Sequence, residues 1–319
     1  MRSIDEGTFV SVNGVAQWLT LRGTDRSNPA LLIIGGPGGG LAALAPFFAD
    51  WEHEFTLLQW DQPGSGFTFA KSGVEAATMA RLVDDGLRVA ELACERLRVA
   101  KVALLCFSGG TIVGLTMARR RPELFSAYIG SGQIVDWARQ DAASFELLLA
   151  RARARGDETM LRELTAIGPP PYADAATDAM KSKYAGAPTS REAPGLADFG
   201  RSIGAALQGM PAGAPYLARG LQWPHLLERA FAAYTALRDE IVAFDARRLG
   251  LTFAVPMYFL QGADDLFTVT SEVQAYAAEL TAPYVELVQI ENAGHATLFL
   301  KKQILALLVR HVRPRLLGA

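Results

Sequence analysis

The sequence places a serine where it could act as a nucleophile. Ser108 lies in the segment 106–110, Cys-Phe-Ser-Gly-Gly, between an apolar run at 102–105 and a helical pattern that begins at 111. A serine on a strand-to-helix turn, with small residues two positions before and two after it, is typical of a nucleophile elbow. The same residues are also compatible with a turn that only caps a helix. Two other segments of the chain bear on this choice.

A glycine-rich turn could supply the hydrogen-bond donors that a serine nucleophile needs. The apolar strand pattern 31–34 runs into Gly-Gly-Pro-Gly-Gly-Gly at 35–40, and such a turn can point backbone N–H groups at one spot. There they would hold an oxyanion, where one well-placed donor lowers the barrier by about 3–4 kcal/mol. A phosphate cradle is the alternative, but the turn lacks the Gly-Lys-Ser/Thr of a P-loop, and Pro37 disfavours a dinucleotide fingerprint. We expect the donors to be the N–H groups of Gly36 and Gly109.

Histidine is scarce, so the general base can be sought by elimination among four residues. His53 precedes a strand pattern in an acidic loop, His225 follows Trp-Pro in a helical region, and His311 lies in the terminal amphipathic pattern. Only His295 follows a glycine just beyond a strand pattern. An imidazole titrates near neutral pH, so it can take a proton from a serine hydroxyl. His295 is therefore the predicted base for Ser108.

An acidic residue behind the histidine would fix its tautomer and stabilise the imidazolium. The strand pattern 257–260 ends in Gln-Gly-Ala-Asp-Asp at 261–265, so Asp264 and Asp265 both offer a carboxylate. Two adjacent side chains cannot both point at one histidine, and their position alone leaves the choice open. The chain order serine, aspartate, histidine is that of the α/β-hydrolase arrangement and differs from the orders in chymotrypsin and subtilisin.

The elements that must position these residues alternate between strands and helices. A hairpin is expected around Asn13-Gly14. Strand patterns follow near 30–34, 55–60, 101–105 and 126–130, with helical patterns between them, notably 77–97. Such alternation predicts an α/β fold with a mostly parallel sheet flanked by helices. The pattern is helical from about 134 to 244, and strands resume at Leu251. We therefore expect a core formed by 1–133 and 248–319, with a helical cap inserted at 134–247.

Composition restricts the class of protein. The chain has 319 residues, a net charge of −2 and 50% apolar residues, which suits a large α/β domain with an insertion and gives no basic footprint for nucleic acid. No apolar run is long enough for a membrane span, and the first residues do not resemble a signal peptide. Cys94 and Cys106 give no disulfide framework and are expected to be buried. A cytoplasmic protein that needs no metal or cofactor fits these features best.

Five elements of the chain, in the same order, resemble the proline iminopeptidase-like branch of the α/β-hydrolase fold. They are Ile-Gly-Gly-Pro-Gly at 34–38, Asp-Gln-Pro-Gly-Ser-Gly at 61–66, Cys-Phe-Ser-Gly-Gly-Thr at 106–111, Gln-Gly-Ala-Asp-Asp at 261–265 and Gly-His at 294–295. The resemblance runs from about Phe9 to Val312. It implies an α/β-hydrolase fold and a triad of Ser108, His295 and Asp265, because the family's acid matches the second aspartate.

This fold class also predicts where the residues meet. Ligands of open α/β sheets bind beyond the carboxyl ends of the strands, and the predicted nucleophile, base, acid and oxyanion donors all follow strand patterns. A cap over that edge would exclude water and shape the pocket. Cap residues that could line it include Phe145, Tyr172, Tyr184, Leu207 and Trp223.

The chain departs from the family's pattern at residues that bear on the substrate. Ile34 replaces a histidine, Pro63 replaces an arginine, Cys106 replaces a glycine, and Gly109 replaces a bulky residue that is often tryptophan. Loss of that bulky side chain predicts a wider acyl pocket and a looser elbow, although the N–H of Gly109 remains. The family's iminopeptidases carry a Trp-Glu element in the cap that meets the substrate's amine. The only Trp-Glu here is Trp51-Glu52, outside the predicted cap.

These features predict a serine hydrolase that cleaves a small ester, amide or short peptide through an acyl-enzyme. A second interpretation is an aminopeptidase that releases an N-terminal proline or apolar residue, with Glu228, Asp239 or Glu240 in place of the missing glutamate. A third, of another class, is a ligand-binding receptor that keeps the triad without catalysis. Dehalogenases and epoxide hydrolases of this fold have aspartate at the elbow, where Ser108 stands. The sequence does not fix the oligomeric state.

Overall fold

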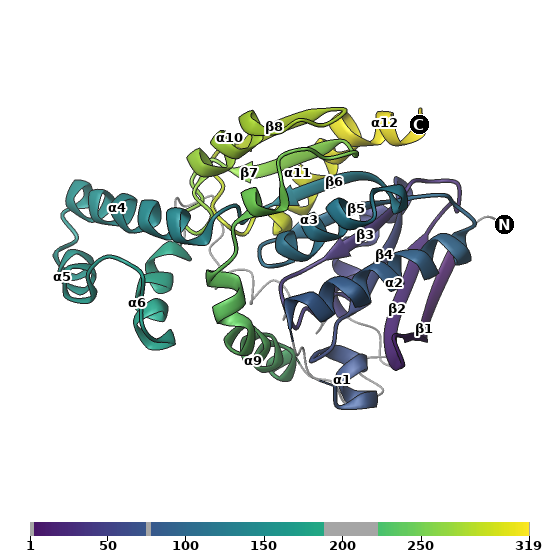
Figure 1. The fold of residues 1–319 in the computed structure, drawn as a ribbon, viewed down its shortest axis with the longest axis horizontal. Coiled ribbons are helices and arrows are strands. Elements are labelled where there is room, and N and C mark those ends of the chain that lie inside the picture. The colour runs from purple at the N-terminus through teal and green to yellow at the C-terminus, as the bar shows by residue number, and fades with distance from the viewer. Residues whose placement is uncertain (1–2, 75–77, 188–222, 319) are drawn as a thin grey trace.

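The described part of the chain forms an eight-stranded sheet with helices on both faces (Figure 1). The computed structural model describes residues 3–74, 78–187 and 223–318. The strand order is β1-β2-β4-β3-β5-β6-β7-β8. The strands are β1 (Ile4–Val12), β2 (Val15–Gly23), β3 (Ala30–Ile34), β4 (Thr56–Asp61), β5 (Val102–Phe107), β6 (Phe125–Ser131), β7 (Met257–Gly262) and β8 (Val285–Ile290). The predicted mostly parallel sheet with flanking helices is confirmed.

The antiparallel part of the sheet lies at one edge. β1 pairs antiparallel with β2, and β2 with β4, whereas the other neighbouring strands are parallel. The predicted hairpin is confirmed, since Val12 faces Val15 across the turn. Asn13 and Gly14 have φ angles of 46° and 85°. Positive φ at both central residues matches the twist of the flanking strands, which favours this two-residue turn.

Helices bury both faces of the sheet. The helices of the described residues are α1 (Gly66–Ser72), α2 (Met79–Leu97), α3 (Gly110–Arg120), α4 (Trp137–Arg155), α5 (Glu158–Ile167), α6 (Ala175–Ala185), α9 (Trp223–Val242), α10 (Thr270–Glu279), α11 (Lys301–Leu307) and α12 (Arg313–Leu317). α2, α3 and α10 share a core with strand residues such as Leu32 and Leu104. The 3₁₀ segment Leu41–His53 and α11 share another with residues such as Leu31 and Leu105. Burial on both faces explains why the central strands are continuous apolar runs in the sequence.

Helices of the predicted cap interval follow β6 and precede β7. α4, α5 and α6 extend away from the side of the sheet (Figure 1) and enclose a small core that includes Leu148, Met160 and Leu164. α9 instead packs against the main core through Leu237 and Ile241. The boundaries of the cap at 134 and 247 stay a prediction. Within the described ranges, none of the helices is both long enough and apolar enough to cross a membrane.

The second part of the sheet begins later than the sequence pattern suggests. The strand predicted at 257–260 is confirmed as β7, which starts at Met257, but the sheet pattern was expected to resume already at Leu251. The residues between contribute an isolated bridge from Thr252 to Thr281. Pro256 lies directly before β7 and has no N–H to add to a ladder, which accounts for the late start.

Candidate active site

Ser108 lies on the sharp turn between β5 and α3. Its φ is 52°, in the left-handed region that non-glycine residues rarely adopt. Its N–H donates to the carbonyl of Ser131 at the end of β6 (3.0 Å), and the N–H of Thr111 donates to the carbonyl of Ser108 (2.8 Å). The turn therefore holds the serine in a strained conformation at the carboxyl end of the sheet, as a nucleophile elbow requires.

Gly110 allows the elbow to approach the glycine-rich turn. A Cβ built on Gly110 would collide with the carbonyl oxygen of Ile34 and lie 2.5 Å from that of Gly35. Both partners are backbone atoms, so they cannot move aside cheaply. The small residue two positions after the serine is thus explained by contact with a segment far away in the sequence.

Ser108, His295 and Asp265 form a continuous hydrogen-bonded chain. His295 Nε2 lies 2.9 Å from Ser108 Oγ, and His295 Nδ1 lies 2.9 Å from Asp265 Oδ2. With its proton on Nδ1, the imidazole can donate to the carboxylate and accept the serine hydrogen on Nε2. The structure therefore brings together three side chains that follow β5, β7 and β8.

Donors surround both carboxylate oxygens of Asp265. Oδ1 accepts the N–H groups of Phe267 (2.8 Å) and Thr268 (2.9 Å). Oδ2 accepts the Thr268 hydroxyl (2.6 Å) and the Gln261 amide (3.0 Å) in addition to His295. Burial alone would raise the pKa of Asp265, but His295 and the hydrogen bonds from Thr268 hold it below its ordinary value. The carboxylate therefore stays ionised in the folded protein.

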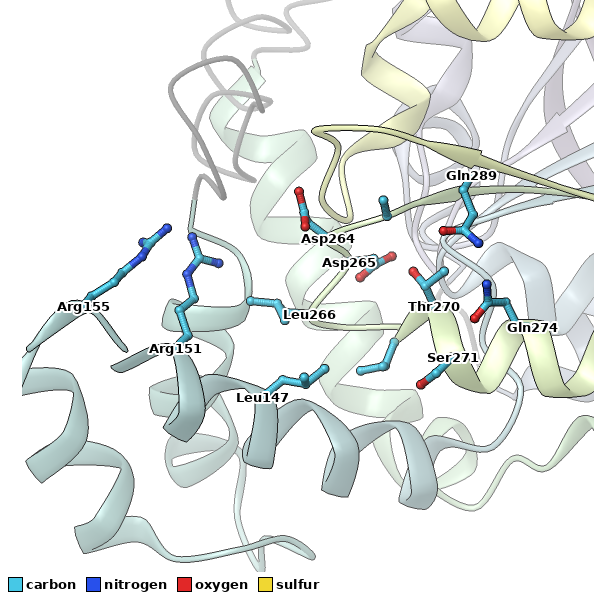
Figure 2. A pocket seen from close by; sticks show the side chains of 12 residues that line it. Leu147, Arg151, Arg155, Asp264, Asp265, Leu266, Thr270, Ser271, Gln274 and Gln289 are labelled. Carbon is cyan, nitrogen blue, oxygen red and sulfur yellow. The ribbon is translucent and has the colours of Figure 1, made fainter. Parts of the chain in front are cut away.

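Asp264 points elsewhere. Figure 2 shows the carboxylates of Asp264 and Asp265 turned in different directions. Asp264 is exposed and lines a pocket of about 520 Å³ between α4 and α10. The described residues that line this pocket include Asp265 but neither Ser108 nor His295. Of the two adjacent aspartates, Asp265 is the one that reaches the imidazole.

The imidazole of His295 is enclosed by residues that the sequence analysis did not identify. The ring centroids of Phe107 and Phe267 lie 5.3 and 5.1 Å from it. Gly132 comes so close that a Cβ there would lie 2.9 Å from Cε1 and 3.2 Å from Nδ1 of His295. Phe107 and Phe267 could have been suspected, because each lies within two residues of a predicted site residue. Gly132 follows β6, which carries no predicted site residue, so nothing in the sequence near it indicated that it would contact His295.

The two predicted oxyanion donors lie side by side. A Cβ built on Gly36 would lie 3.8 Å from the backbone nitrogen of Gly109. Within the described residues, neither N–H donates to another group of the protein. Both therefore remain available to a ligand atom near the elbow.

Pro37 packs against Gly109. A Cβ built on Gly109 would lie 2.8 Å from Pro37 Cδ and 3.4 Å from Gly36 Cα. Pro37 therefore occupies the space that the Cβ of a larger residue at position 109 would need. The predicted widening of the pocket beside Gly109 finds no support at this point.

Helix α9, which lies in the predicted cap interval, backs the glycine-rich turn. Gly38 has a φ of 72°, and a Cβ there would lie 2.7 Å from the Cβ of Ala233. Arg229, on the same helix, donates to the carbonyl of Gly64 (3.2 Å). α9 therefore contacts both the glycine-rich turn and the 61–66 loop, and it links the predicted cap to the predicted oxyanion donors.

The other histidines lie outside this arrangement. His311 Nδ1 is 2.8 Å from Glu286 Oε1. His53 ends the 3₁₀ segment Leu41–His53 and is not in the loop that the sequence suggested. His225 belongs to α9, and its side chain lies outside the described residues. Among the described residues, no group of three or more His, Cys, Asp or Glu side chains could hold a metal ion.

The cap residues that were expected to line the pocket are only partly described. Phe145 is buried in the core of the α4–α6 helices. The hydroxyls of Tyr172 and Tyr184 donate to the carbonyl of Gly168 and to Glu163, both within the predicted cap interval. Leu207 and the side chain of Trp223 lie outside the described residues.

Comparison with known proteins gives matches over nearly the whole chain. The family model of the alpha/beta hydrolase fold matches residues 29–302. The probable aminopeptidase YbaC of Bacillus subtilis (strain 168) is 26% identical over 311 residues, which cover 96% of each protein.

Two solved structures illustrate the likeness in fold. The proline iminopeptidase-related protein of Thermus thermophilus has a TM-score of 0.59 at 21% identity, covering 98% of this chain and 99% of that one. The 2-hydroxy-6-oxo-6-phenylhexa-2,4-dienoate hydrolase of a Rhodococcus species has a TM-score of 0.60 at 17% identity, with the same coverage. At such low identity these structures show the fold alone. The family match spans the elbow, Asp265 and His295, and the chain therefore belongs to the alpha/beta hydrolase fold family.

Proposed function

We propose that the protein is a serine hydrolase that cleaves a small ester or amide through an acyl-enzyme intermediate. The observation that carries this proposal is the hydrogen-bonded chain from Ser108 through His295 to Asp265, with 2.9 Å at each step. A serine hydroxyl is a poor nucleophile until a base takes its proton. The arrangement supplies that base, together with a carboxylate that orients it.

In the first half-reaction, Ser108 Oγ attacks the substrate carbonyl while its proton passes to His295 Nε2. The carbonyl oxygen gains negative charge, which the N–H groups of Gly36 and Gly109 stabilise. His295 then gives the proton to the leaving group, and the tetrahedral intermediate collapses to the acyl-enzyme. The ionised Asp265 stabilises the transient imidazolium without accepting its proton.

In the second half-reaction, water replaces the leaving group. His295 takes a proton from the water while the water oxygen attacks the acyl carbonyl. Collapse of the second tetrahedral intermediate releases the acid, and the proton returns to Ser108 Oγ. The same base, acid and oxyanion donors therefore serve both steps.

A fluorophosphonate probe tests this proposal directly. Attack by a nucleophilic serine forms an Oγ–phosphorus bond and releases fluoride. We expect the wild-type protein to be labelled, and Ser108→Ala to lose labelling while keeping its circular dichroism spectrum and thermal midpoint. Unlabelled but folded wild-type protein would favour the non-catalytic receptor instead. Labelling that persists in Ser108→Ala would show that the elbow assignment is wrong.

We further propose that neutral acyl esters are preferred over N-terminal prolyl amides. The support is the absence of a Trp-Glu element from residues 134–247. A free ammonium in a closed site needs a carboxylate partner, because an unpaired buried charge costs several kcal/mol. A neutral acyl chain needs no such partner and gains about 0.8 kcal/mol for each buried CH₂.

The aminopeptidase alternative has support from the relatives. One is named a probable aminopeptidase, and one structural neighbour a proline iminopeptidase-related protein. Of the three carboxylates suggested as amine partners, Glu240 accepts the N–H of Met79 on α2 (3.0 Å), and the side chain of Asp239 is fully exposed. Glu228 is also exposed, but it lies next to Arg229, whose side chain donates to the carbonyl of Gly64 in the 61–66 loop, so it is the candidate that the assay tests.

A paired assay separates the two substrate classes. We would measure kcat/KM for p-nitrophenyl butyrate and prolyl-p-nitroanilide, with the uncatalysed rates subtracted, since the ester is more labile. We expect the ester to be preferred and N-acetylation of the prolyl substrate to matter little. A strong prolyl activity that is lost on N-acetylation and in Glu228→Gln, but kept in the Asp239→Asn control, would establish the aminopeptidase.

A further inference from the structure

Gln62 is a buried side chain that the proposed mechanism does not yet use. It belongs to the 61–66 loop, and the residue is only 1% exposed. Its amide nitrogen Nε2 donates to the carbonyl of Gly35 (3.1 Å), and its backbone N–H donates to the carbonyl of Gly39 (3.4 Å). The same residue therefore contacts the glycine-rich turn at two points.

The Gly35 carbonyl belongs to the same peptide unit as the Gly36 N–H. A peptide bond is planar, and in the trans form its C=O and N–H point in opposite directions. The cis bond identified in the described residues is Pro170–Pro171, so the Gly35–Gly36 bond is trans. A hydrogen bond that fixes the carbonyl of Gly35 therefore also fixes the direction of the Gly36 N–H.

The elbow confines this peptide unit from another side. A Cβ built on Gly110 would lie 2.5 Å from the oxygen and 2.7 Å from the carbonyl carbon of Gly35. Contact with Gly110 limits where the peptide lies, but close packing of small groups does little to fix its rotation. Glycine has the widest choice of backbone angles, so two consecutive glycines need an external restraint to hold one orientation. Gln62 supplies a directional one.

We propose that Gln62 is a positioning residue that aims the Gly36 N–H at the oxyanion. This inference rests on the proposed role of Ser108 as the nucleophile. The hydrogen bond to the carbonyl of Gly35 also polarises the peptide, which makes its N–H a stronger donor. Gln62 thus acts on the transition state through the backbone, without touching the substrate.

The chain offers a matched control on the preceding strand. Gln59 is also 1% exposed, and its Nε2 donates to the carbonyl of Leu41 (2.8 Å). In both glutamines Oε1 has no hydrogen-bond partner among the described residues. Replacement of either by methionine removes one buried donor and keeps a similar shape. Only at Gln62 does the lost hydrogen bond hold the peptide of a proposed oxyanion donor.

The experiment compares Gln62→Met and Gln59→Met with the wild type. For each we would measure the thermal midpoint, kcat and KM for p-nitrophenyl butyrate, and the rate constant of fluorophosphonate labelling. Loss of an oxyanion donor itself lowers kcat by about 10²–10³-fold. We expect loss of its orientation in Gln62→Met to lower kcat and the labelling rate by about tenfold or more, with KM within about twofold. Gln59→Met should stay within about threefold of the wild type at a similar loss of stability.

Equal kcat and labelling rates in the two folded variants would overturn the role of Gln62. So would a change confined to KM. Should Gln62→Met not fold, Gln62→Leu gives the same comparison, since it also lacks a donor. If the wild-type protein is not labelled at Ser108, the proposed function is wrong. If the wild type is labelled and Gln62→Met is labelled at the same rate, only the role of Gln62 is wrong.

Discussion

The thiol of Cys106 occupies the space beside Gly114. A Cβ built on Gly114 would collide with Sγ and lie 3.2 Å from the Cβ of Cys106. Cys106 is fully buried at the end of β5, and burial raises the pKa of its thiol, so it serves as a small apolar side chain. The glycine on α3 therefore makes room for the cysteine that stands where the family has a glycine two residues before the nucleophile.

This contact predicts a coupled pair of substitutions. Gly114→Ala should destabilise the protein by about 1–3 kcal/mol through overpacking, although alanine favours a helix over glycine by about 1 kcal/mol. Cys106→Gly should remove most of that penalty. Urea unfolding of both single variants and the double variant gives the coupling energy. Additive effects would show that the two side chains can separate at little cost.

Gly132 should matter for catalysis through its contact with His295. Gly132→Ala places a methyl group against the imidazole and should lower kcat by about tenfold or more, because small displacements of reacting groups are costly. Gly156→Ala is the control, since Gly156 has a φ of 63°, close to the 59° of Gly132, and nothing within 4 Å of its Cβ position. Both variants should lose about 1–2 kcal/mol of stability from the left-handed backbone. If Gly156→Ala lowers kcat as much as Gly132→Ala does, the effect of Gly132→Ala comes from lost stability and not from its contact with His295.

The two adjacent aspartates should differ sharply. Asp265→Asn should lower kcat by up to about 10⁴-fold, because an amide at this position no longer favours the histidine tautomer that serves as base. Asp264→Asn should change kcat by less than about threefold, since its exposed side chain faces the pocket of Figure 2. Steady-state assays of both variants check this ranking. The reverse ranking would move the role of the acid to Asp264.

The lowered pKa of Asp265 predicts a dependence of stability on pH. A carboxyl group whose folded pKa lies below its unfolded value stabilises the protein above the unfolded pKa, which is about 3.9 for aspartate. That contribution is lost as the pH falls through the folded pKa. Unfolding free energies of the wild type should therefore fall more steeply below about pH 4 than those of Asp265→Asn. Parallel curves would mean that the carboxyl has the same pKa in both states.

The ion pair between Lys181 and Asp141 joins α6 to α4 inside the predicted cap, and both side chains are buried. Lys181→Met leaves the charge of Asp141 buried without its partner and should cost about 3–5 kcal/mol of unfolding free energy. The double variant Lys181→Met/Asp141→Leu should recover most of that loss, because neither charge remains. Denaturant unfolding of the three proteins measures this, and an equally unstable double variant would show that the pair is needed for packing.

The sequence alone determined the features that depend on neighbouring residues. The elbow around Ser108, the glycine-rich turn at 35–40 and the hairpin at Asn13-Gly14 each need particular residues within a few positions. The order of strands and helices followed from apolar runs that alternate with helical patterns. Local backbone angles and burial periodicity leave such signals in the chain, so the α/β class could be predicted before the structure was known.

Tertiary structure decided the contacts that join distant segments. Their position after a strand left Asp264 and Asp265 equal, and only the family resemblance favoured Asp265. The hydrogen bond between Asp265 and His295 is made by the fold, which brings together residues 30 positions apart. Gly132 touches His295, and Gln62 holds the carbonyl of Gly35. No periodicity records these pairings, because each depends on how strands far apart in the chain are placed in one sheet. Packing therefore fixes the orientation of side chains whose types the sequence already provided.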